Sequence, residues 1–297
     1  MTVDRVAAAQ APWRQQASRV LRHGDAGSGH RWLELEVPPS TGTPDPGQFV
    51  QLLLRPPLGA VLLPRPMSIA GARRTRRALV LQFLYAAVGT GTRALAALEE
   101  GAVVDVLGPL GQGFPLEAAG APVLLAGGRG VAPLLFAADQ LSAAGRRCDL
   151  VFGARSRGYL VGLDEARPRI RGANGALHLC TDDGSLGHRG TVLDKLERLA
   201  PRIDGTIVLH ACGPHAMLKA VALWAIRRGV RAFLAMESVM ACGTGVCRGC
   251  PLPRSAAAKR RFRPDVTPSL MGNAEWAMCC TEGPVFEARD LDWESIE

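Results

Sequence analysis

The sequence lacks any apolar run long enough to cross a membrane. Its most apolar stretches, residues 121–126 and 131–138, are separated by the tetrapeptide GGRG at 127–130. A membrane-spanning helix needs about 20 consecutive apolar residues. The first residues, MTVDRVAAAQAPWRQQ, also lack the apolar core of a signal peptide. We therefore expect a cytoplasmic protein without a membrane span.

Lysine is also scarce: 3 lysines stand beside 32 arginines, and the formal net charge is +8. An arginine excess that is spread along the whole chain indicates a bias of composition rather than a surface for nucleic acid. The basic runs at 73–77 and 259–261 are short and contain no interleaved aromatic residues. We expect them to be solvated loops, and we expect no nucleic-acid partner.

The chain has 297 residues, of which 47% are hydrophobic, enough for two or three small domains. Up to residue 118, short apolar or alternating segments separated by Pro/Gly-rich turns predict an antiparallel β-barrel. From residue 121, strands alternate with helices, which predicts a parallel α/β sheet with helices on both faces. After residue 231, Cys, Gly and Pro dominate. The predicted architecture is a multidomain chain with the segments 1–118, 119–235 and 236–297.

Three cysteines, Cys242, Cys247 and Cys250, have the spacing C-x4-C-x2-C. This is the spacing of plant-type 2Fe–2S ferredoxins, whose fourth thiolate lies far downstream. The glycines between the cysteines permit the backbone to turn its amides inward. Zinc sites more often use paired CxxC or Cys/His spacings, so a structural zinc is the weaker interpretation.

Five other cysteines remain after the cluster loop is assigned. Cys279 and Cys280 both compete to be the fourth ligand. Cys148, Cys180 and Cys212 lie in or next to predicted strands, where a lone cysteine is usually a small buried hydrophobe.

A glycine turn, AGGRGVAP at 126–133, lies between a predicted buried strand and a helix. Such a turn can present backbone amides to a pyrophosphate, although it can also simply pack a strand closely on a helix. It lacks the full G-x-G-x-x-G spacing. The tripeptide CGP at 212–214 follows another strand of the same domain, and ligands of open α/β sheets bind at these strand ends.

Two further segments, RPMS at 65–68 and VGTGT at 88–92, lie in the predicted barrel. An arginine fork, a rigid proline and a Gly-Thr turn at a helix start suit an anionic dinucleotide. The alternative is a proline-rich turn between strands without a binding role.

Together these motifs resemble one family: the electron-transfer subunits of NAD-dependent dihydroorotate dehydrogenase, in the ferredoxin–NADP reductase superfamily. The resemblance runs from about residue 17 to 290. The blocks that resemble the FAD domain are PGQFV (46–50), RPMSIA (65–70), VGTGT (88–92) and LGPLGQGF (107–114). Those that resemble the pyridine-nucleotide domain are GGRGVAPL (127–134), FGARS (152–156), TDDGSLGHRG (181–190) and ACGPHAML (211–218). Those that resemble the cluster domain are MACGTGVCRGC (240–250) and CTEGPVF (280–286).

The resemblance implies three cofactors, FAD, a 2Fe–2S cluster and NAD, and assigns residues to each. It makes Cys280 the fourth cluster ligand after Cys242, Cys247 and Cys250, with Cys279 as its buried neighbour. The residues implied to contact FAD are Arg65, Pro66, Met67, Ser68, Leu84, Tyr85, Ala86, Gly91 and Thr92. Those implied to contact NAD are Gly127, Gly128, Gly130, Cys212, Gly213 and Pro214. By the same resemblance, Ser68 lies near the flavin ring and Cys212 beside the nicotinamide, as the catalytic pair.

The activity implied is electron transfer between NAD(H) and a catalytic, FMN-type dehydrogenase subunit in a hetero-oligomer. The process would be dihydroorotate oxidation to orotate in pyrimidine biosynthesis, with the substrate bound by the partner. One alternative is a paralogous NAD(P)H-linked subunit of a sulfhydrogenase or a ferredoxin–NADP oxidoreductase. A more remote alternative is a non-redox zinc-binding module.

The chain departs from the family pattern in three places. Residues 251–279 form a longer connection between the third and fourth ligands than we expect, with the extra run PRSAAAKRRFRPDVTPS. This insert could add a basic contact for the partner or be a solvated loop. Ala126 replaces a usual glycine, and Arg129 replaces a usual aliphatic residue.

The sequence also bears on the choice between NADH and NADPH. Thr181, Asp182 and Asp183 follow a predicted strand, and carboxylates near the ribose would disfavour a 2′-phosphate. Arg155 and Arg157 follow another strand and could accept that phosphate instead. We predict a preference for NADH.

Overall fold

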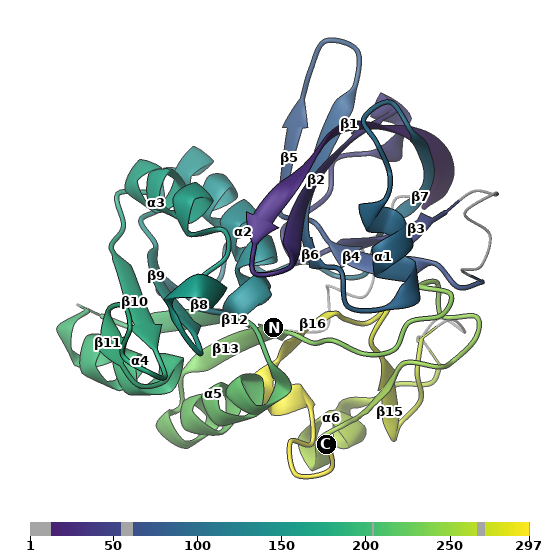
Figure 1. Cartoon of the computed structure of the whole chain (residues 1–297). Helices are drawn as coiled ribbons and strands as arrows, with labels where there is room; N and C mark the ends of the chain where they lie inside the picture. Colours follow the sequence, from purple (N-terminus) through teal and green to yellow (C-terminus); the bar gives the residue numbers. More distant parts are fainter. Residues whose placement is uncertain (1–12, 55–61, 204, 266–270, 297) are drawn as a thin grey trace.

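The computed structural model describes residues 13–54, 62–203, 205–265 and 271–296. Residues 1–12 and the part of the predicted insert at 266–270 lie outside this description. Two seven-stranded sheets and one two-stranded sheet organise the described chain. Figure 1 shows the first sheet in purple and blue, the second in teal and green, and the last segment in yellow-green and yellow.

The first sheet is antiparallel throughout, with the strand order β4-β3-β7-β1-β2-β6-β5. Its strands are β1 (Arg14–Gly27), β2 (His30–Val37), β3 (Phe49–Leu53), β4 (Arg65–Ser68), β5 (Gly71–Arg74), β6 (Leu79–Ala86) and β7 (Val103–Leu110). Alternation sets the inward face, because successive strand residues point to opposite sides. Leu33, Leu35 and Val37 of β2 are buried, and Leu35 pairs with Leu81 of β6. Helix α1 (Thr90–Ala96) follows β6. The predicted antiparallel β sheet is confirmed.

The second sheet has the order β11-β10-β9-β8-β12-β13-β16, and all its pairs except the last are parallel. Its strands are β8 (Ala121–Gly127), β9 (Asp149–Ala154), β10 (Leu177–Thr181), β11 (His188–Arg189), β12 (Ile207–Cys212), β13 (Arg231–Ala235) and β16 (Val285–Glu287). Helices α2 (Val131–Ala143) and α3 (Leu163–Gly172) pack in one core cluster, and α4 (Val192–Leu199) and α5 (His215–Arg228) in another. The predicted parallel sheet with helices on both faces is therefore confirmed.

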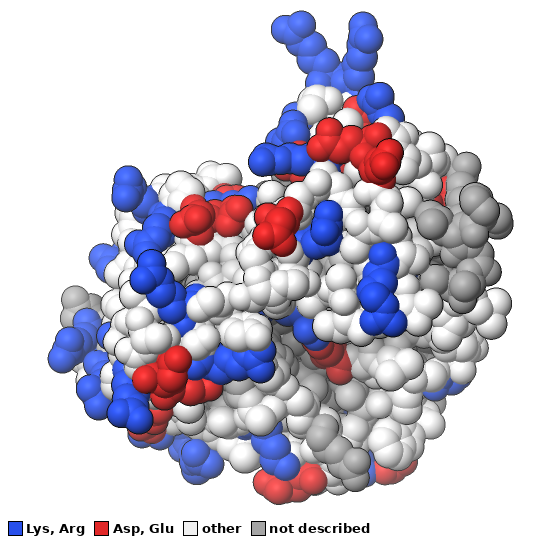
Figure 2. All heavy atoms as spheres, in the orientation of Figure 1, with Lys and Arg blue, Asp and Glu red and all other residues white. Residues whose placement is uncertain are grey.

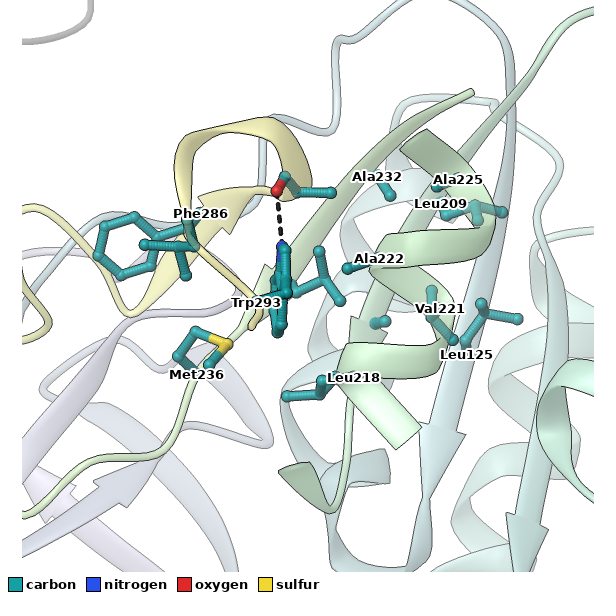
Figure 3. Packing of buried hydrophobic residues seen from close by; sticks show 14 of the residues in the cluster. Leu125, Leu209, Leu218, Val221, Ala222, Ala225, Ala232, Met236, Phe286 and Trp293 are labelled. Carbon is teal, nitrogen blue, oxygen red and sulfur yellow. Dashed lines mark hydrogen bonds between the residues drawn. The ribbon is translucent and has the colours of Figure 1, made fainter. Parts of the chain in front are cut away.

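The last segment is tied to the second sheet. Strand β16 pairs antiparallel with β13, with Leu234 opposite Phe286. Phe286 and Trp293 belong to the core cluster that includes α5, and Trp293 lies beside this helix (Figure 3). The Trp293 indole donates a hydrogen bond to the Ala288 carbonyl at 2.7 Å. The sheet thus continues past residue 235, where the sequence predicted a boundary.

The remaining elements of this segment are β14 (Pro251–Pro253), α6 (Ala256–Arg261) and β15 (Trp276–Met278). Strands β14 and β15 form the antiparallel two-stranded sheet. Short 3-10 turns are η1 (Pro39–Thr41), η2 (Gly128–Gly130), η3 (Arg157–Tyr159), η4 (Ala200–Arg202) and η5 (Ala288–Asp290). Among the described residues, no helix is long and apolar enough to cross a membrane.

The surface charge is intermixed rather than gathered. On the face shown in Figure 2, basic and acidic side chains both occur over each sheet, with more basic ones along the left edge, and two basic side chains project over the β5–β6 hairpin. Arg73 of this hairpin pairs with Glu34 at 3.3 Å, and Arg74 donates to the Thr43 hydroxyl at 2.7 Å. This face therefore presents no continuous basic patch.

His210 is a buried polar residue in the core of the second sheet. His210 of β12 is fully buried between Phe114, at 5.5 Å between ring centroids, and Phe233, at 5.7 Å. Neither ring nitrogen has a hydrogen-bond partner among the described residues. Burial, with minor contributions from two arginines, lowers the pKa of His210 to about 3, so the imidazole is neutral in the folded protein.

Candidate functional site

A cavity of about 230 Å³ opens where the two sheets and the cysteine-rich segment meet. Of the residues implied to bind cofactors, those that line it are Pro66, Met67, Ser68, Leu84, Tyr85, Ala86, Thr92, Gly130 and Cys212. They come from β4, β6, α1, η2 and β12, which are far apart in the sequence. The structure therefore brings the two catalytic candidates, Ser68 and Cys212, to one cavity.

The two candidates differ in environment. Ser68 is exposed at the end of β4, whereas Cys212 is 4% exposed at the end of β12. Burial raises the pKa of the Cys212 thiol, and the nearby Glu237 carboxylate adds to the increase. Cys212 is therefore a neutral thiol and not a thiolate nucleophile.

Several implied residues lie away from the cavity lining: Arg65, Gly91, Gly127, Gly128, Gly213 and Pro214. The Arg65 guanidinium donates to the carbonyls of Pro64 at 3.0 Å and Leu63 at 3.2 Å, so it folds back on its own loop. Gly91 is buried within α1.

Most glycines of the turns at 126–133 and 212–214 allow the two turns to pack closely against each other. A Cβ on Gly130 would lie 2.4 Å from the Cys212 carbonyl oxygen, and one on Gly127 would lie 2.6 Å from Pro214 Cδ. The ends of β8 and β12 therefore approach too closely for any side chain. Gly128 differs, because it has a φ of +53° and open space around it.

Ten lining residues were not identified from the sequence: Phe49, Val88, Arg129, Ala132, Pro133, Met236, Glu237, Ser238, Met240 and Pro284. Seven of them fall inside the blocks that resemble the family, which was the signal in the sequence that could have identified them: Phe49, Val88, Arg129, Ala132, Pro133, Met240 and Pro284. Arg129 and Glu237 form an ion pair at 3.4 Å, with side chains 49% and 64% exposed. No sequence pattern links two residues so far apart.

The cysteine loop turns its backbone amides toward sulfur. Cys242 Sγ accepts hydrogen bonds from the backbone N–H groups of Thr244 and Cys247, each at 3.4 Å. Gly243 and Gly245 have φ angles of +76° and +85°, which allow this inward turn. In the same way, Cys250 Sγ accepts from the Cys280 N–H at 3.4 Å.

These contacts change the acidity of the thiols. Burial alone would raise the pKa of Cys242, but the N–H donors of Cys247 and Thr244 outweigh it and lower the pKa to about 6. A hydrogen bond from the Cys280 side chain is the main cause that lowers the pKa of Cys250 to about 7. The same bond, together with burial, raises the pKa of Cys280. Hydrogen bonds within the protein thus stabilise the thiolates of Cys242 and Cys250.

The two adjacent cysteines face different surroundings. Cys280 hydrogen-bonds to Cys250 and receives the Gly245 N–H. Cys279 is fully buried, and its thiol donates to the Met236 carbonyl at 3.7 Å. Burial raises the pKa of Cys279. Only Cys280 therefore points its sulfur at the loop that carries the other three cysteines.

The four thiols fit a centre with two metal ions better than a single ion. Cys247 hydrogen-bonds to Cys242, and Cys280 to Cys250, so the thiols form two pairs. A 2Fe–2S cluster takes four cysteines shared between two irons, whereas a structural zinc needs all four around one ion.

The residues that bear on NADH and NADPH lie at the ends of β9 and β10. Asp183 accepts hydrogen bonds from the Ser185 hydroxyl at 2.6 Å and the Ser185 N–H at 2.9 Å, which lower the pKa of its carboxyl. Thr181 is buried and donates to the Leu186 carbonyl at 3.0 Å. The Arg155 guanidinium stacks 3.5 Å over the Tyr159 ring. The preference for NADH stays a prediction.

Comparison with known proteins gives consistent relatives. Residues 124–222 match the oxidoreductase NAD-binding domain family. The chain is 35% identical over 249 residues to the dihydroorotate dehydrogenase B (NAD(+)) electron transfer subunit of Listeria monocytogenes serotype 4b, covering 83% of this chain and 87% of the relative. It is 39% identical to the subunit of the same name from Shouchella clausii, over 83% of this chain and 86% of that one.

Solved structures give the same fold. The chain is similar to one from the NADH-dependent reduced ferredoxin-NADP oxidoreductase, with a TM-score of 0.76 and 26% identity over 93% of this chain and 90% of that one. The Neisseria gonorrhoeae ferredoxin NADP+ reductase with bound FAD and NADP has a TM-score of 0.60 and 17% identity, over 72% of this chain and 92% of that one. The latter likeness concerns the fold alone.

Proposed function

Because the chain belongs to the family of dihydroorotate dehydrogenase B electron-transfer subunits, we propose that it passes electrons between NAD(H) and a partner dehydrogenase. FAD and a 2Fe–2S cluster would carry the electrons within the chain. The partner would be a catalytic, FMN-type subunit in a hetero-oligomer, and the process dihydroorotate oxidation to orotate in pyrimidine biosynthesis. The proposed modules are the FAD-binding segment 1–118, the NAD-binding segment 119–235 and the 2Fe–2S segment 236–297.

One observation carries this proposal: the cavity borders the loop that carries Cys242, Cys247 and Cys250. Met240 lines the cavity and precedes Cys242 by two residues. Buried Gln51 of β3 donates from Nε2 to the Met240 carbonyl at 3.0 Å. A Cβ on Gly243 would lie 2.8 Å from Gln51 Cγ. A flavin in the cavity would therefore lie beside the loop that holds the cluster.

The cavity residues suit a flavin. Met67, Leu84 and Ala86 are buried and supply apolar surface, and the Ser68 hydroxyl is free to turn toward a polar ring atom. The Tyr85 hydroxyl is hydrogen-bonded to His23 Nε2 at 2.8 Å, and burial raises the pKa of Tyr85 to about 12. Tyr85 therefore stays neutral. When bound, FAD supplies the exchange between two-electron hydride chemistry and one-electron transfer.

The second sheet would hold the nicotinamide nucleotide. We assign Cys212 to the nicotinamide face, because its buried, neutral thiol reaches the same cavity as Ser68. Gly128 is the turn residue with open space, so its backbone is the part of the turn accessible to a phosphate. Gly127, Gly130, Gly213 and Pro214 would support this site by holding β8 and β12 together.

Cys242, Cys247, Cys250 and Cys280 are proposed to hold the cluster. Residues 246–249 are exposed, and Val246 and Val239 are 70% and 80% exposed. These apolar side chains next to the loop suit contact with the partner subunit. All eight cysteines are free thiols, which suits the reducing cytoplasm that the sequence predicts.

A second candidate function has one specific observation in its favour. The solved structure with a TM-score of 0.76 is that of an NADH-dependent reduced ferredoxin-NADP oxidoreductase. A subunit of that type would exchange electrons with ferredoxin and NADP(H) instead of a dihydroorotate-oxidising partner.

Spectroscopy and reconstitution test the proposal. The purified chain should show flavin bands together with cluster absorption, and the complex with its native partner should reduce NAD+ with dihydroorotate. A colourless, zinc-containing protein would overturn the redox assignment. Electron transfer from reduced ferredoxin, with none from dihydroorotate, would favour the second candidate.

A further inference from the structure

We infer that the turn formed by residues 271–276, together with Arg248, Arg254 and Glu282, is a clamp that fixes the fourth cysteine against the three-cysteine loop. This inference rests on the proposed function, in which Cys280 is the fourth cluster ligand. It gives the insert between the third and fourth ligands a positioning role within the chain.

Glu282 is the centre of the clamp. Its side chain is only 13% exposed, and Oε1 accepts the backbone N–H groups of Gly272 and Met278, each at 2.8 Å. Its own N–H donates to the Met278 carbonyl at 2.9 Å. Glu282 therefore closes the short turn that contains Cys280 and ties that turn to residues 271–276.

The second oxygen of Glu282 pairs with Arg254, whose side chain is 12% exposed. Arg254 Nε also donates to the Asn273 carbonyl at 2.8 Å, and its backbone N–H donates to the Glu275 carbonyl at 2.9 Å. Both charges are thus largely removed from water, and each is paired and hydrogen-bonded. Removing either partner of such a buried pair leaves the other charge unpaired and strongly destabilises the folded state.

Arg248 joins the same turn to the three-cysteine loop. It lies between Cys247 and Cys250, and it has a φ of +57°, a conformation that favours glycine. Its Nη1 donates to the Met271 carbonyl at 2.6 Å. Residues 271–276 are therefore held by the cysteine loop on one side and by the strand that leads to Cys280 on the other.

Strand pairing completes the arrangement. β14 begins directly after Cys250, and β15 ends at Met278, two residues before Cys280. Pro251 pairs with Met278, and the Cys279 N–H donates to the Cys250 carbonyl at 2.9 Å. The clamp thus sets the register that places Cys280 beside Cys250.

Three further cations of the insert, Lys259, Arg261 and Arg263, also pair within the chain. Lys259 of α6 pairs with Glu275, which belongs to the turn 271–276, and Arg261 pairs with Asp290. Arg263 pairs with Asp265 at 3.3 Å. Each of these three cations therefore has an acidic partner within the chain.

The test compares Arg254→Met and Glu282→Gln with a matched control, Arg263→Met. The control removes an ion pair of the same insert in which the Arg263 side chain is 67% exposed. Iron and acid-labile sulfide are measured per chain, and bleaching of the cluster absorption is followed after a chelator is added. We expect the two clamp variants to lose the cluster at least tenfold faster than wild type, and the control to behave like wild type. Flavin content and reduction of the flavin by NADH should be unchanged in all three.

A measurement on the cluster-free protein separates positioning from ligation. Amide hydrogen exchange of residues 278–282 should be faster in Arg254→Met and Glu282→Gln than in wild type, and unchanged in Arg263→Met. Arg254→Lys keeps the charge but loses the Nε donor, and it should give an intermediate loss rate. Wild-type cluster retention and exchange in both clamp variants would overturn the inference. Absence of a cluster from the wild-type chain would instead overturn the proposed function beneath it.

Discussion

Cys279 and Cys280 are adjacent and both buried, so serine substitutions at these positions form a matched pair. Cys280→Ser replaces the thiol that hydrogen-bonds to Cys250 within the four-cysteine group. Cys279→Ser replaces a thiol whose hydrogen-bond acceptor is the Met236 carbonyl, at 3.7 Å, in the core. The first change removes the proposed fourth cluster ligand, whereas the second changes a buried thiol outside the four-cysteine group.

The magnitudes follow from burial. A hydroxyl at position 279 enters a fully buried site, which costs about 1–3 kcal/mol of folding free energy without an ideal partner. Cys279→Ser should therefore lower the midpoint of urea unfolding while iron and sulfide per chain stay at the wild-type value. Cys280→Ser should lose most of the iron and sulfide, because only three thiolates remain for two irons.

The assay is iron and sulfide content together with visible absorption and the electron paramagnetic resonance spectrum of the reduced protein. Flavin absorbance measures the integrity of the rest of the chain. Loss of the cluster in Cys279→Ser with retention in Cys280→Ser would refute the geometric reasoning, because it would mean that the side chains have exchanged roles.

Three further predictions concern the cavity, the preference for NADH and the buried core. Gln51→Leu should leave the buried Met240 carbonyl without its hydrogen-bond donor, which lowers the free energy of unfolding by about 1–3 kcal/mol. It should also slow electron transfer from the flavin to the cluster in stopped-flow experiments; an unchanged rate would contradict the proposed contact between the cavity and the cluster loop. The kcat/KM of the wild type should be higher with NADH than with NADPH. The double variant Asp182→Ala, Asp183→Ala should reduce the ratio of the two kcat/KM values; a wild-type preference for NADPH would contradict the prediction. The pKa of His210 is lowered to about 3 in the folded state, whereas the ordinary pKa of histidine is about 6.5. Below pH 6.5 the unfolded chain therefore binds a proton at His210 that the folded chain does not bind. The free energy of unfolding falls as the pH decreases from 6.5 toward 3. Between pH 6.5 and 5 the loss should be about 2 kcal/mol in urea unfolding, and His210→Leu should remove most of this pH dependence; an equal loss in the variant would exclude His210 as its source.

Local patterns predicted much of the fold because their causes are local. The alternation of Leu33, Leu35 and Val37 reflects the two-residue period of a strand, and the run APVLLAG at 121–127 reflects a strand buried on both faces. The cysteine spacing indicated a cluster loop because a short loop fixes the positions of its own sulfurs.

Other features depend on tertiary contact and left no periodic signal. The cysteine spacing kept Cys279 and Cys280 as equal candidates, because the choice depends on which sulfur faces Cys250 across the β14–β15 pair. The family resemblance, and not the spacing, favoured Cys280. Arg129 and Glu237 meet only because η2 and the segment after β13 border one cavity. Arg254 and Glu282 likewise meet only in the folded chain, because most of the insert separates them in the sequence.

The pairing of β16 with β13 has a consequence for synthesis of the chain on the ribosome. β13 ends at Ala235, whereas β16 starts at Val285, so residues 236–284 must be made before this edge of the sheet is covered. At about 5–20 residues per second, the edge stays open for roughly 2–10 s. An uncovered edge strand offers unpaired backbone groups to neighbouring chains. The nascent protein therefore passes through an interval in which aggregation competes with completion of the sheet, and this interval lengthens with every residue added to the insert.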